Sequence, residues 1–228
     1  MLILMGKITT QLPANHGELM SQTTPKNIPS TKKDEKILVV PARKLFSSSS
    51  INGFHPLKDF DFYANLIATN KEFLWRSAME EDITYKQIIP YLIFTHDNKY
   101  FLMQRKAGAS EQRLKNKHTL GIGGHIREDD IAGNDIIDWA KREFHEEVNY
   151  EGKLDVEILG LINDESNDVG MVHTGFAFLL KGDNPNISVR SELKEGHLLT
   201  LEECANYYDA METWTQLVFT YLKERNNG

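Results

Sequence analysis

The stretch from Gly121 to Gly152 constrains the fold most, because a glycine-rich strand end leads there into a strongly patterned helix. Its sequence is GIGGHIREDDIAGNDIIDWAKREFHEEVNYEG. From about Asn134 to Val148, apolar residues recur every three or four positions, which is the spacing of a helix with one buried stripe. The preceding run HTLGIGG, residues 118 to 124, has the composition of a strand that ends on glycines. We therefore expect a strand, a loop and an amphipathic helix in this order.

The rest of the chain mixes strand-like and helix-like patterns. Two apolar runs, QIIPYLIFT and KYFLMQRK, are separated by His96-Asp97-Asn98, which indicates a β-hairpin. Thr200 and Glu203 have the spacing of a capping box, which predicts the start of a helix. Mixed strands with helices late in the chain favour an α/β or α+β sandwich over a doubly wound sheet. Further strands are expected at 37–46 (an edge strand, because of Pro41), 73–75 (strand or turn), 153–163 and 171–181, with helices at 58–69 and 209–224 and a polar loop at 164–170.

The chain has 228 residues, enough for one domain of generous size. Residues 1–35 are rich in Thr, Pro, Asn, Ser and Lys without sustained periodicity, so we expect a flexible N-terminal tail. Met20 is an alternative start of translation. We assign residues 36–228 to one domain, in which 36–84 form an N-terminal elaboration.

Composition argues against several classes of protein. The formal net charge of −7 is the opposite of the basic face that a general nucleic-acid binder needs. No apolar run approaches the ~18 residues of a membrane span, and the opening MLILM is too short for a signal peptide. The single cysteine, Cys204, cannot form an intramolecular disulfide, which fits a reducing compartment. We expect a cytoplasmic protein with neither membrane nor nucleic-acid partners, in which Cys204 is a small apolar helix residue and no nucleophile.

Glu143, Glu146 and Glu147 stand at i, i+3 and i+4, so a helix gathers their side chains on one patch beside its apolar stripe. Like charges at this spacing repel each other by about 0.2–0.5 kcal/mol per pair. A hard cation such as Mg²⁺ turns that cost into an advantage, because it prefers carboxylate oxygens. The alternative is an ordinary solvated helix face. Gly123 and Gly124 favour the metal site, since glycines let the backbone approach a metal or a phosphate closely.

The same stretch resembles the Nudix box, G-x5-E-x7-R-E-U-x-E-E-x-G-U, in which U is a bulky aliphatic residue. Gly124 matches the first glycine of the box. Residues 142–147, REFHEE, match its R-E-U-x-E-E core, with the aromatic Phe144 at the aliphatic position. The runs KQIIPYLIF, MQRK, HTLGIGGHI and MVHTGFAF also resemble a bacterial Nudix subgroup of predicted phosphoesterases. The resemblance covers most of residues 37 to 224.

The resemblance implies an α/β fold, a Nudix-type α/β/α sandwich with a mixed sheet. It also implies a hydrolase that cleaves a phosphoanhydride bond in a nucleoside diphosphate-linked or related small molecule by attack of metal-activated water. The three glutamates would coordinate Mg²⁺ or Mn²⁺, with a backbone carbonyl near Gly123 or Gly124 as a further ligand. Arg142 would orient a carboxylate by an ion pair. Nudix proteins are often dimers, so the resemblance is also consistent with a homodimer.

The loop of the box departs from the family pattern. Gly124 and Arg142 are 18 positions apart where the box requires 14, so the loop carries four extra residues. Counting back from Arg142 puts Asn134 at the first box glutamate, and counting forward from Gly124 puts Asp130 there. Asp129 or Asp130 is our candidate for the missing carboxylate.

Several side chains outside the box are further candidates for the site. Arg105, at the end of a predicted strand, could clamp phosphate oxygens, although loop cations often serve solubility alone. His125 directly follows the glycine pair and could hydrogen-bond phosphate or cap the turn. Glu192 and Glu195, in SELKEGHLL, could provide the general base that activates water. The expected core residues are a hydrogen-bonded His173 and the aromatic Trp75, Tyr91 and Phe94.

Two alternatives on the same fold stay open. A non-catalytic Nudix-fold ligand-binding or regulatory module would show a broken carboxylate triplet or an attached DNA-binding domain, and neither pattern is present in the sequence. An isomerase acting on isopentenyl diphosphate would need a cysteine near the active site, whereas Cys204 lies in a predicted late helix. The substrate is not specified, because family members act on nucleoside triphosphates, dinucleotides, nucleotide sugars and coenzyme A derivatives.

Overall fold

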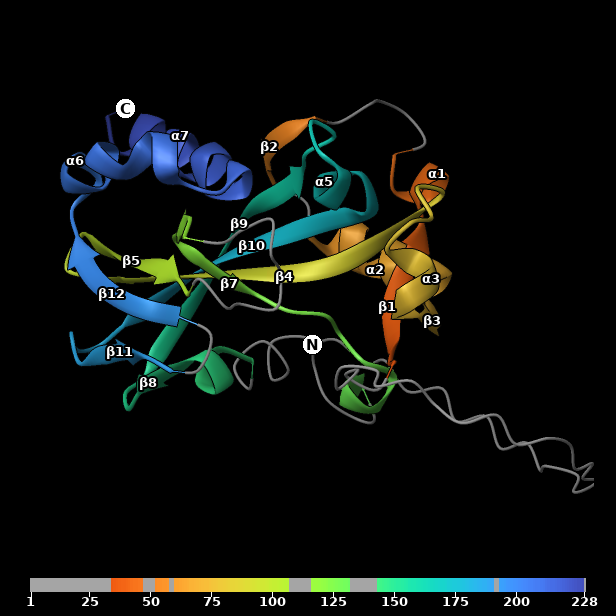
Figure 1. Cartoon of the computed structure of the whole chain (residues 1–228), viewed down its shortest axis with the longest axis horizontal. Helices are drawn as coiled ribbons and strands as arrows, with labels where there is room; N and C mark the ends of the chain where they lie inside the picture. The colour runs from red at the N-terminus through yellow and green to blue at the C-terminus, as the bar shows by residue number, and fades with distance from the viewer. Residues whose placement is uncertain are drawn as a thin grey trace, which may run out of the picture. The chain divides into compact units, whose positions relative to one another are not determined.

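The computed structural model describes residues 34–46, 52–57, 60–106, 116–131, 143–190 and 193–227. Backbone contacts group Asp34–Gly228 into one unit, whose strands and helices are drawn in Figure 1. All but the last two residues of the predicted tail lie outside the described part of the chain. The elaboration predicted for 36–84 contributes strands to the same sheet as the rest of the unit.

A mixed sheet lies at the centre of this unit and has ten strands within the described residues. β4 and β10 are parallel, and the other strand pairs of this sheet are antiparallel. The main path runs through β12 (Leu193–Leu199), β5 (Lys99–Arg105), β4 (Tyr85–His96), β10 (His173–Gly182), β9 (Leu154–Asn163) and β2 (Gly53–Pro56). Beside it lie β1 (Lys36–Pro41) with β3 (Glu72–Trp75), β6 (His118–Thr119) on β5, and β7 (Gly121–Gly123) on β4, while β8 (Val148–Tyr150) and β11 (Ile187–Val189) form a separate pair.

β4 is central because residues 88–94, IIPYLIF, form a continuous apolar run. The ten residues 86–95 are all buried, as expected for a strand that is covered on both faces. The hairpin to β5 turns at Asp97 and Asn98, whose φ angles of 46° and 60° suit a type I′ turn. This confirms the predicted hairpin.

One face of the sheet is covered by α6 (Leu201–Cys204) and α7 (Thr213–Asn227), which lie together in Figure 1. They bury Cys204 and Val218 in one core cluster with Tyr91 of β4. Thr200 accepts from the backbone of Glu203 and the Glu203 side chain accepts in return, so the predicted capping box is confirmed. Cys204 is an apolar helix residue, as expected, and burial raises the pKa of its thiol to about 12.

The opposite face is covered by α2 (Phe60–Asn70) and by the helical residues 143–147. Phe144 is fully buried and stacks on Phe94, with ring centroids 6.0 Å apart. This helix ends where β8 begins, at Val148. Helices on both faces of a mixed sheet confirm the predicted α/β sandwich.

Two predictions near the N-terminal end of the described chain were wrong. β1 is no edge strand, because its first half pairs with β3 and its second half with β4. Pro41 stands at the end of β1, directly before α1 (Ala42–Leu45), where it ends the strand. Trp75 does not pack in the core: it is 52% exposed before α3 (Arg76–Met79), and the Lys36 ammonium lies 5.7 Å from its ring centroid.

Two later boundaries also differ from the prediction. The loop expected at 164–170 contains the start of α5 (Asp168–Val172), because the Asn167 side chain caps this short helix at Gly170. The last helix starts at Thr213, since the preceding residues form the 3₁₀ helix η3 (Ala205–Ala210). A second 3₁₀ helix, η2 (Glu128–Ile131), follows β7. None of the described helices has the length and apolar character required to cross a membrane.

Candidate functional site

The three box glutamates lie on the short helical segment 143–147. Glu143 and Glu147 are half-buried and Glu146 is exposed. Phe144 and Val148 point into the core, so the packing of these two side chains fixes which face of the helix carries the carboxylates. Arg142, expected to orient one of them, lies outside the described residues, as does Asn134.

The glycine turn that follows β7 lies directly against Glu143. A Cβ atom at Gly124 would stand 2.0 Å from Oε1 of Glu143 and 2.6 Å from its Cδ. The neighbouring Gly123 is also tight, because a Cβ there would stand 3.0 Å from Ile89. The absence of a side chain at Gly124 is therefore what lets the carboxylate approach the backbone of the turn. The structure thus brings together Gly124 and Glu143, which are separated in sequence by the long box loop.

Tyr91 forms the floor under the glycine strand. Its ring would be 2.2 Å from a Cβ at Gly121. Its hydroxyl is hydrogen-bonded to Thr215 of α7 at 2.7 Å and to Thr119 at 3.1 Å. Burial raises the pKa of Tyr91 to about 12, so it stays protonated and serves packing, as expected. Phe94 is also buried, which confirms the second core prediction.

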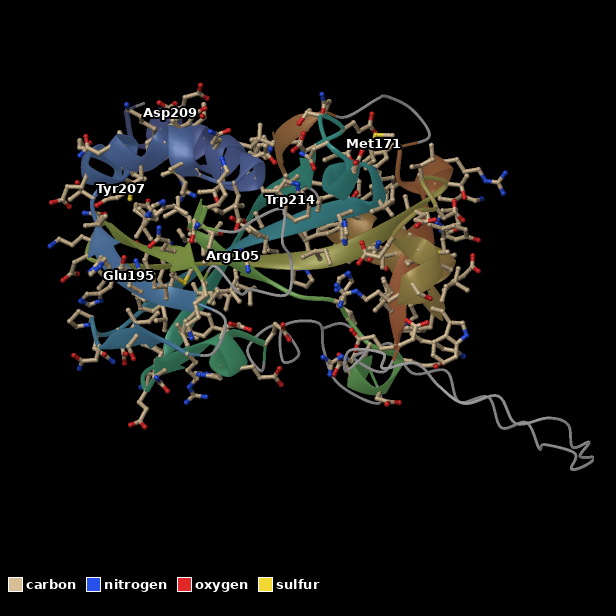
Figure 2. All side chains as sticks on the ribbon, in the orientation of Figure 1. Arg105, Met171, Glu195, Tyr207, Asp209 and Trp214 are labelled. Atoms are coloured by element: carbon tan, nitrogen blue, oxygen red, sulfur yellow. The ribbon has the colours of Figure 1, made fainter. Side chains whose placement is uncertain are left out.

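Arg105 is the last residue of β5, and Figure 2 labels it near the middle of the view. Its Nε donates to Oε1 of Glu212 at 2.5 Å, and Glu212 is buried directly before α7. Burial alone would lower the pKa of the guanidinium, but Glu212 outweighs burial and Glu147 adds to the rise. In Glu212, burial raises the pKa of the carboxyl more than Arg105 lowers it. We take the pair as charged at neutral pH, because the guanidinium is always protonated and is the direct hydrogen-bond partner of this carboxyl group.

Further carboxylates were predicted to supply the general base and the missing box glutamate. Glu192 lies outside the described residues. Glu195, which Figure 2 labels, lies on β12. Its carboxylate is 3.5 Å from the Lys194 ammonium and 3.9 Å from the His197 ring. Asp130 accepts a hydrogen bond from the backbone N–H of Arg127 at 2.9 Å and so closes its own 3₁₀ turn. None of these contacts assigns a general base.

His125 points into a buried polar cluster. Its Nε2 lies 2.6 Å from Oε1 of Gln87 and 3.2 Å from Nε2 of His173. Burial lowers the pKa of His125 well below its usual value, and the positive charges of Arg76 and Arg127 add to this. His173 is buried and its Nδ1 donates to the carbonyl of Val169 at 2.7 Å, as predicted for a core histidine. Glu80, Gln87 and Glu212 were not singled out from the sequence, because no motif marks them.

A cavity of about 630 Å³ lies elsewhere, between β2 and α7. Its lining includes Phe54, Asp164 and Tyr221, but none of the candidate site residues. This cavity is therefore separate from the candidate site.

Known proteins resemble this chain in both sequence and structure. No protein-family model matches the chain. It is 35% identical over 207 residues to Protein YmaB of Bacillus subtilis, a match that covers 84% of this chain and 99% of that protein. The structure is similar to the crystal structure of Tm1382, a candidate Nudix hydrolase, with a TM-score of 0.70 and 30% sequence identity over 82% of this chain and 98% of that one.

Proposed function

Because the chain belongs to the Nudix hydrolase family, we propose that it is an Mg²⁺-dependent enzyme that hydrolyses a phosphoanhydride bond in a nucleoside diphosphate-linked or related small molecule. The observation that carries the proposal is the contact between the glycine turn and the glutamate-bearing helix. Glu143, the first glutamate of the triplet, lies against Gly124 so closely that no side chain would fit there.

The residues present fit a hard divalent cation. Carboxylate oxygens and a backbone carbonyl are the donors that Mg²⁺ and Mn²⁺ prefer. Glu143, Glu146 and Glu147 would hold the ion together with the backbone of Gly124, and the missing Cβ leaves room for that approach. When bound, the ion would lower the pKa of water and neutralise charge on the diphosphate.

The chain's own side chains would bind and orient the substrate. Arg105, held at Nε by Glu212, would bind phosphate oxygens with its terminal amino groups. The backbone of Gly123 would contact the same phosphate groups, whereas the His125 ring points into the cluster with Gln87 and His173. Arg142 would hold one of the carboxylates in position. Glu192 or Glu195 would take a proton from the attacking water. Of these two, Glu195 lies on β12.

The test is a screen for Mg²⁺-dependent phosphate or monophosphate release over nucleoside di- and triphosphates, nucleotide sugars and dinucleotides. Glu146→Gln and Glu147→Gln keep the size of the side chain and remove its charge, so each should reduce turnover at least about 100-fold on any substrate found. The matched control is Glu151→Gln, an exposed glutamate just beyond the helix, which should keep full activity.

Undiminished turnover in Glu146→Gln or Glu147→Gln would refute the assignment of the metal site. Tight binding of a nucleotide without any turnover would instead favour a non-catalytic binding or regulatory module. Isothermal titration of each compound in the presence of Mg²⁺ separates these two outcomes.

A further inference from the structure

We propose that Glu80, His125 and His173 form a second metal site, suited to a transition-metal ion such as Zn²⁺ and separate from the carboxylate site of the box. One ligand atom from each of these residues lies within 4.8 Å of the others. The three residues come from the end of α3, from the turn after β7 and from the start of β10. This inference does not depend on the proposed hydrolase activity.

The distance between the two imidazoles is that of a shared ion. Nε2 of His125 and Nε2 of His173 are 3.2 Å apart. Two nitrogens bound at about 2.0–2.1 Å to one tetrahedral Zn²⁺ stand roughly 3.3 Å apart. The rings therefore need only small movements to bind one ion between them.

Hydrogen bonds orient His173 as a ligand. Its Nδ1 faces the carbonyl oxygen of Val169 at 2.7 Å, and a carbonyl can only accept. Nδ1 therefore carries the proton, which leaves the lone pair of Nε2 directed toward His125. An imidazole fixed in this way by a backbone carbonyl is the usual second-shell arrangement of a metal-binding histidine.

His125 meets a polar group that can complete the site. Gln87 is fully buried, and its amide nitrogen donates to the carbonyl of Met79, so its Oε1 points at His125. Without a metal, His125 donates a proton to this oxygen from Nε2. With a metal, that proton would move to Nδ1, and Gln87 could bind the ion or accept from a water on it.

The charges around the cluster are balanced. Arg76 pairs with Glu80 at 3.1 Å and with Glu35 at 3.3 Å, and Glu35 also pairs with Arg127 at 2.7 Å. The two arginines that face His125 are thus compensated by carboxylates. Glu80 is held in place by Arg76 and supplies the one anionic ligand. Two imidazoles and one carboxylate select borderline ions such as Zn²⁺ or Co²⁺ over Mg²⁺, which prefers oxygen.

The experiment measures metal binding by the full chain after treatment with a chelator. Co²⁺ titration followed by visible absorption should show one tetrahedral site that includes nitrogen ligands and persists in excess Mg²⁺, and Zn²⁺ should displace the Co²⁺. Glu80→Gln and His173→Ala should weaken Co²⁺ binding by about 100-fold or more. His197→Ala is the control, because this side chain is 66% exposed on β12.

The outcomes separate this site from the box. Retention of the Co²⁺ spectrum in Glu146→Gln, together with its loss in Glu80→Gln, would support the inference. Absence of a Co²⁺ site in the parent chain, or unchanged binding in both cluster variants, would overturn it and leave a hydrogen-bonded histidine pair. Glu80→Gln preserves side-chain volume at a half-buried position, and circular dichroism verifies that it folds.

Discussion

Gly124→Ala should separate catalysis from stability. The added Cβ would stand 2.0 Å from Oε1 of Glu143, whereas non-bonded atoms need about 3.5 Å. The carboxylate must therefore move by roughly 1.5 Å, which a flexible side-chain end can do at a cost of about 0.5–1.5 kcal/mol. Metal ligands tolerate only about 0.2 Å, and a misplacement of about 1 Å can cost 100-fold in rate. We expect kcat/KM to fall about 100-fold, equivalent to about 2.7 kcal/mol, while Tm falls by only a few degrees.

Gly121→Ala, at the start of β7 just before this turn, provides the matched opposite case. Its Cβ would stand 2.2 Å from the ring of Tyr91, which is buried and held by two hydroxyl partners. The ring cannot swing away, so overpacking should cost about 1–3 kcal/mol or more, a fall of roughly 2–12 °C in Tm. Among the described glycines only Gly53 has a left-handed φ, so alanine strains the backbone at neither position.

The assay combines thermal unfolding with Mg²⁺-dependent release of phosphate from the best substrate of the screen. Isothermal titration of Mg²⁺ adds a readout that does not need turnover. The reasoning is refuted if Gly124→Ala keeps kcat/KM within about threefold of the parent. It also fails if the two variants lose stability equally, because that would mean Glu143 is as firmly packed as Tyr91.

Three further predictions rest on single contacts. Glu212→Ala leaves the partly exposed Arg105 without its buried partner, so it should lower the free energy of unfolding in urea by about 2–3 kcal/mol. A loss of less than about 1 kcal/mol would contradict a buried ion pair. Thr200→Ala removes the capping box with Glu203 and should cost about 1 kcal/mol by the same measurement, and no loss would mean that the cap contributes nothing. Burial alone would raise the pKa of Asp164, but surrounding hydroxyl and amide donors outweigh it and lower the pKa. The ionised form of Asp164 therefore stabilises the fold above about pH 4, and this stabilisation is lost as the pH falls through the lowered pKa. Between about pH 6 and pH 3, the Tm of Asp164→Asn should fall less than the Tm of the parent. Equal falls in Tm would exclude this contribution.

The sequence predicted the elements that depend on neighbouring residues. The hairpin at residues 96–98 and the capping box at Thr200 each involve only a few adjacent positions. The start of the last helix was placed too early, because η3 continues the helix-like apolar spacing with tighter turns. The exposure of Trp75 was missed because an aromatic residue in a strand pattern gives no sign of which face is covered.

The sequence predicted how residues of the candidate site are arranged only within the box motif. The glutamate triplet follows from helical spacing alone, whereas the contact of Glu143 with Gly124 required the structure. Arg105 and Glu212 are 107 positions apart, and His125 and His173 are 48 apart. No periodicity links residues at such separations, so only the pairing of the strands reveals these neighbours.

In the proposed function, Arg105 extends the site beyond the box. Its Nε is held by Glu212, and a planar guanidinium anchored at Nε has a fixed orientation and still carries N–H donors on its two terminal amino groups. The charge of Glu147 on the box helix also raises the pKa of this guanidinium. If Arg105 binds phosphate, Glu212 fixes the direction in which it does so and removes part of the ordering cost on binding. Glu212→Ala should then raise KM as well as lower stability, whereas an unchanged KM would leave Arg105 as a purely structural link between β5 and α7.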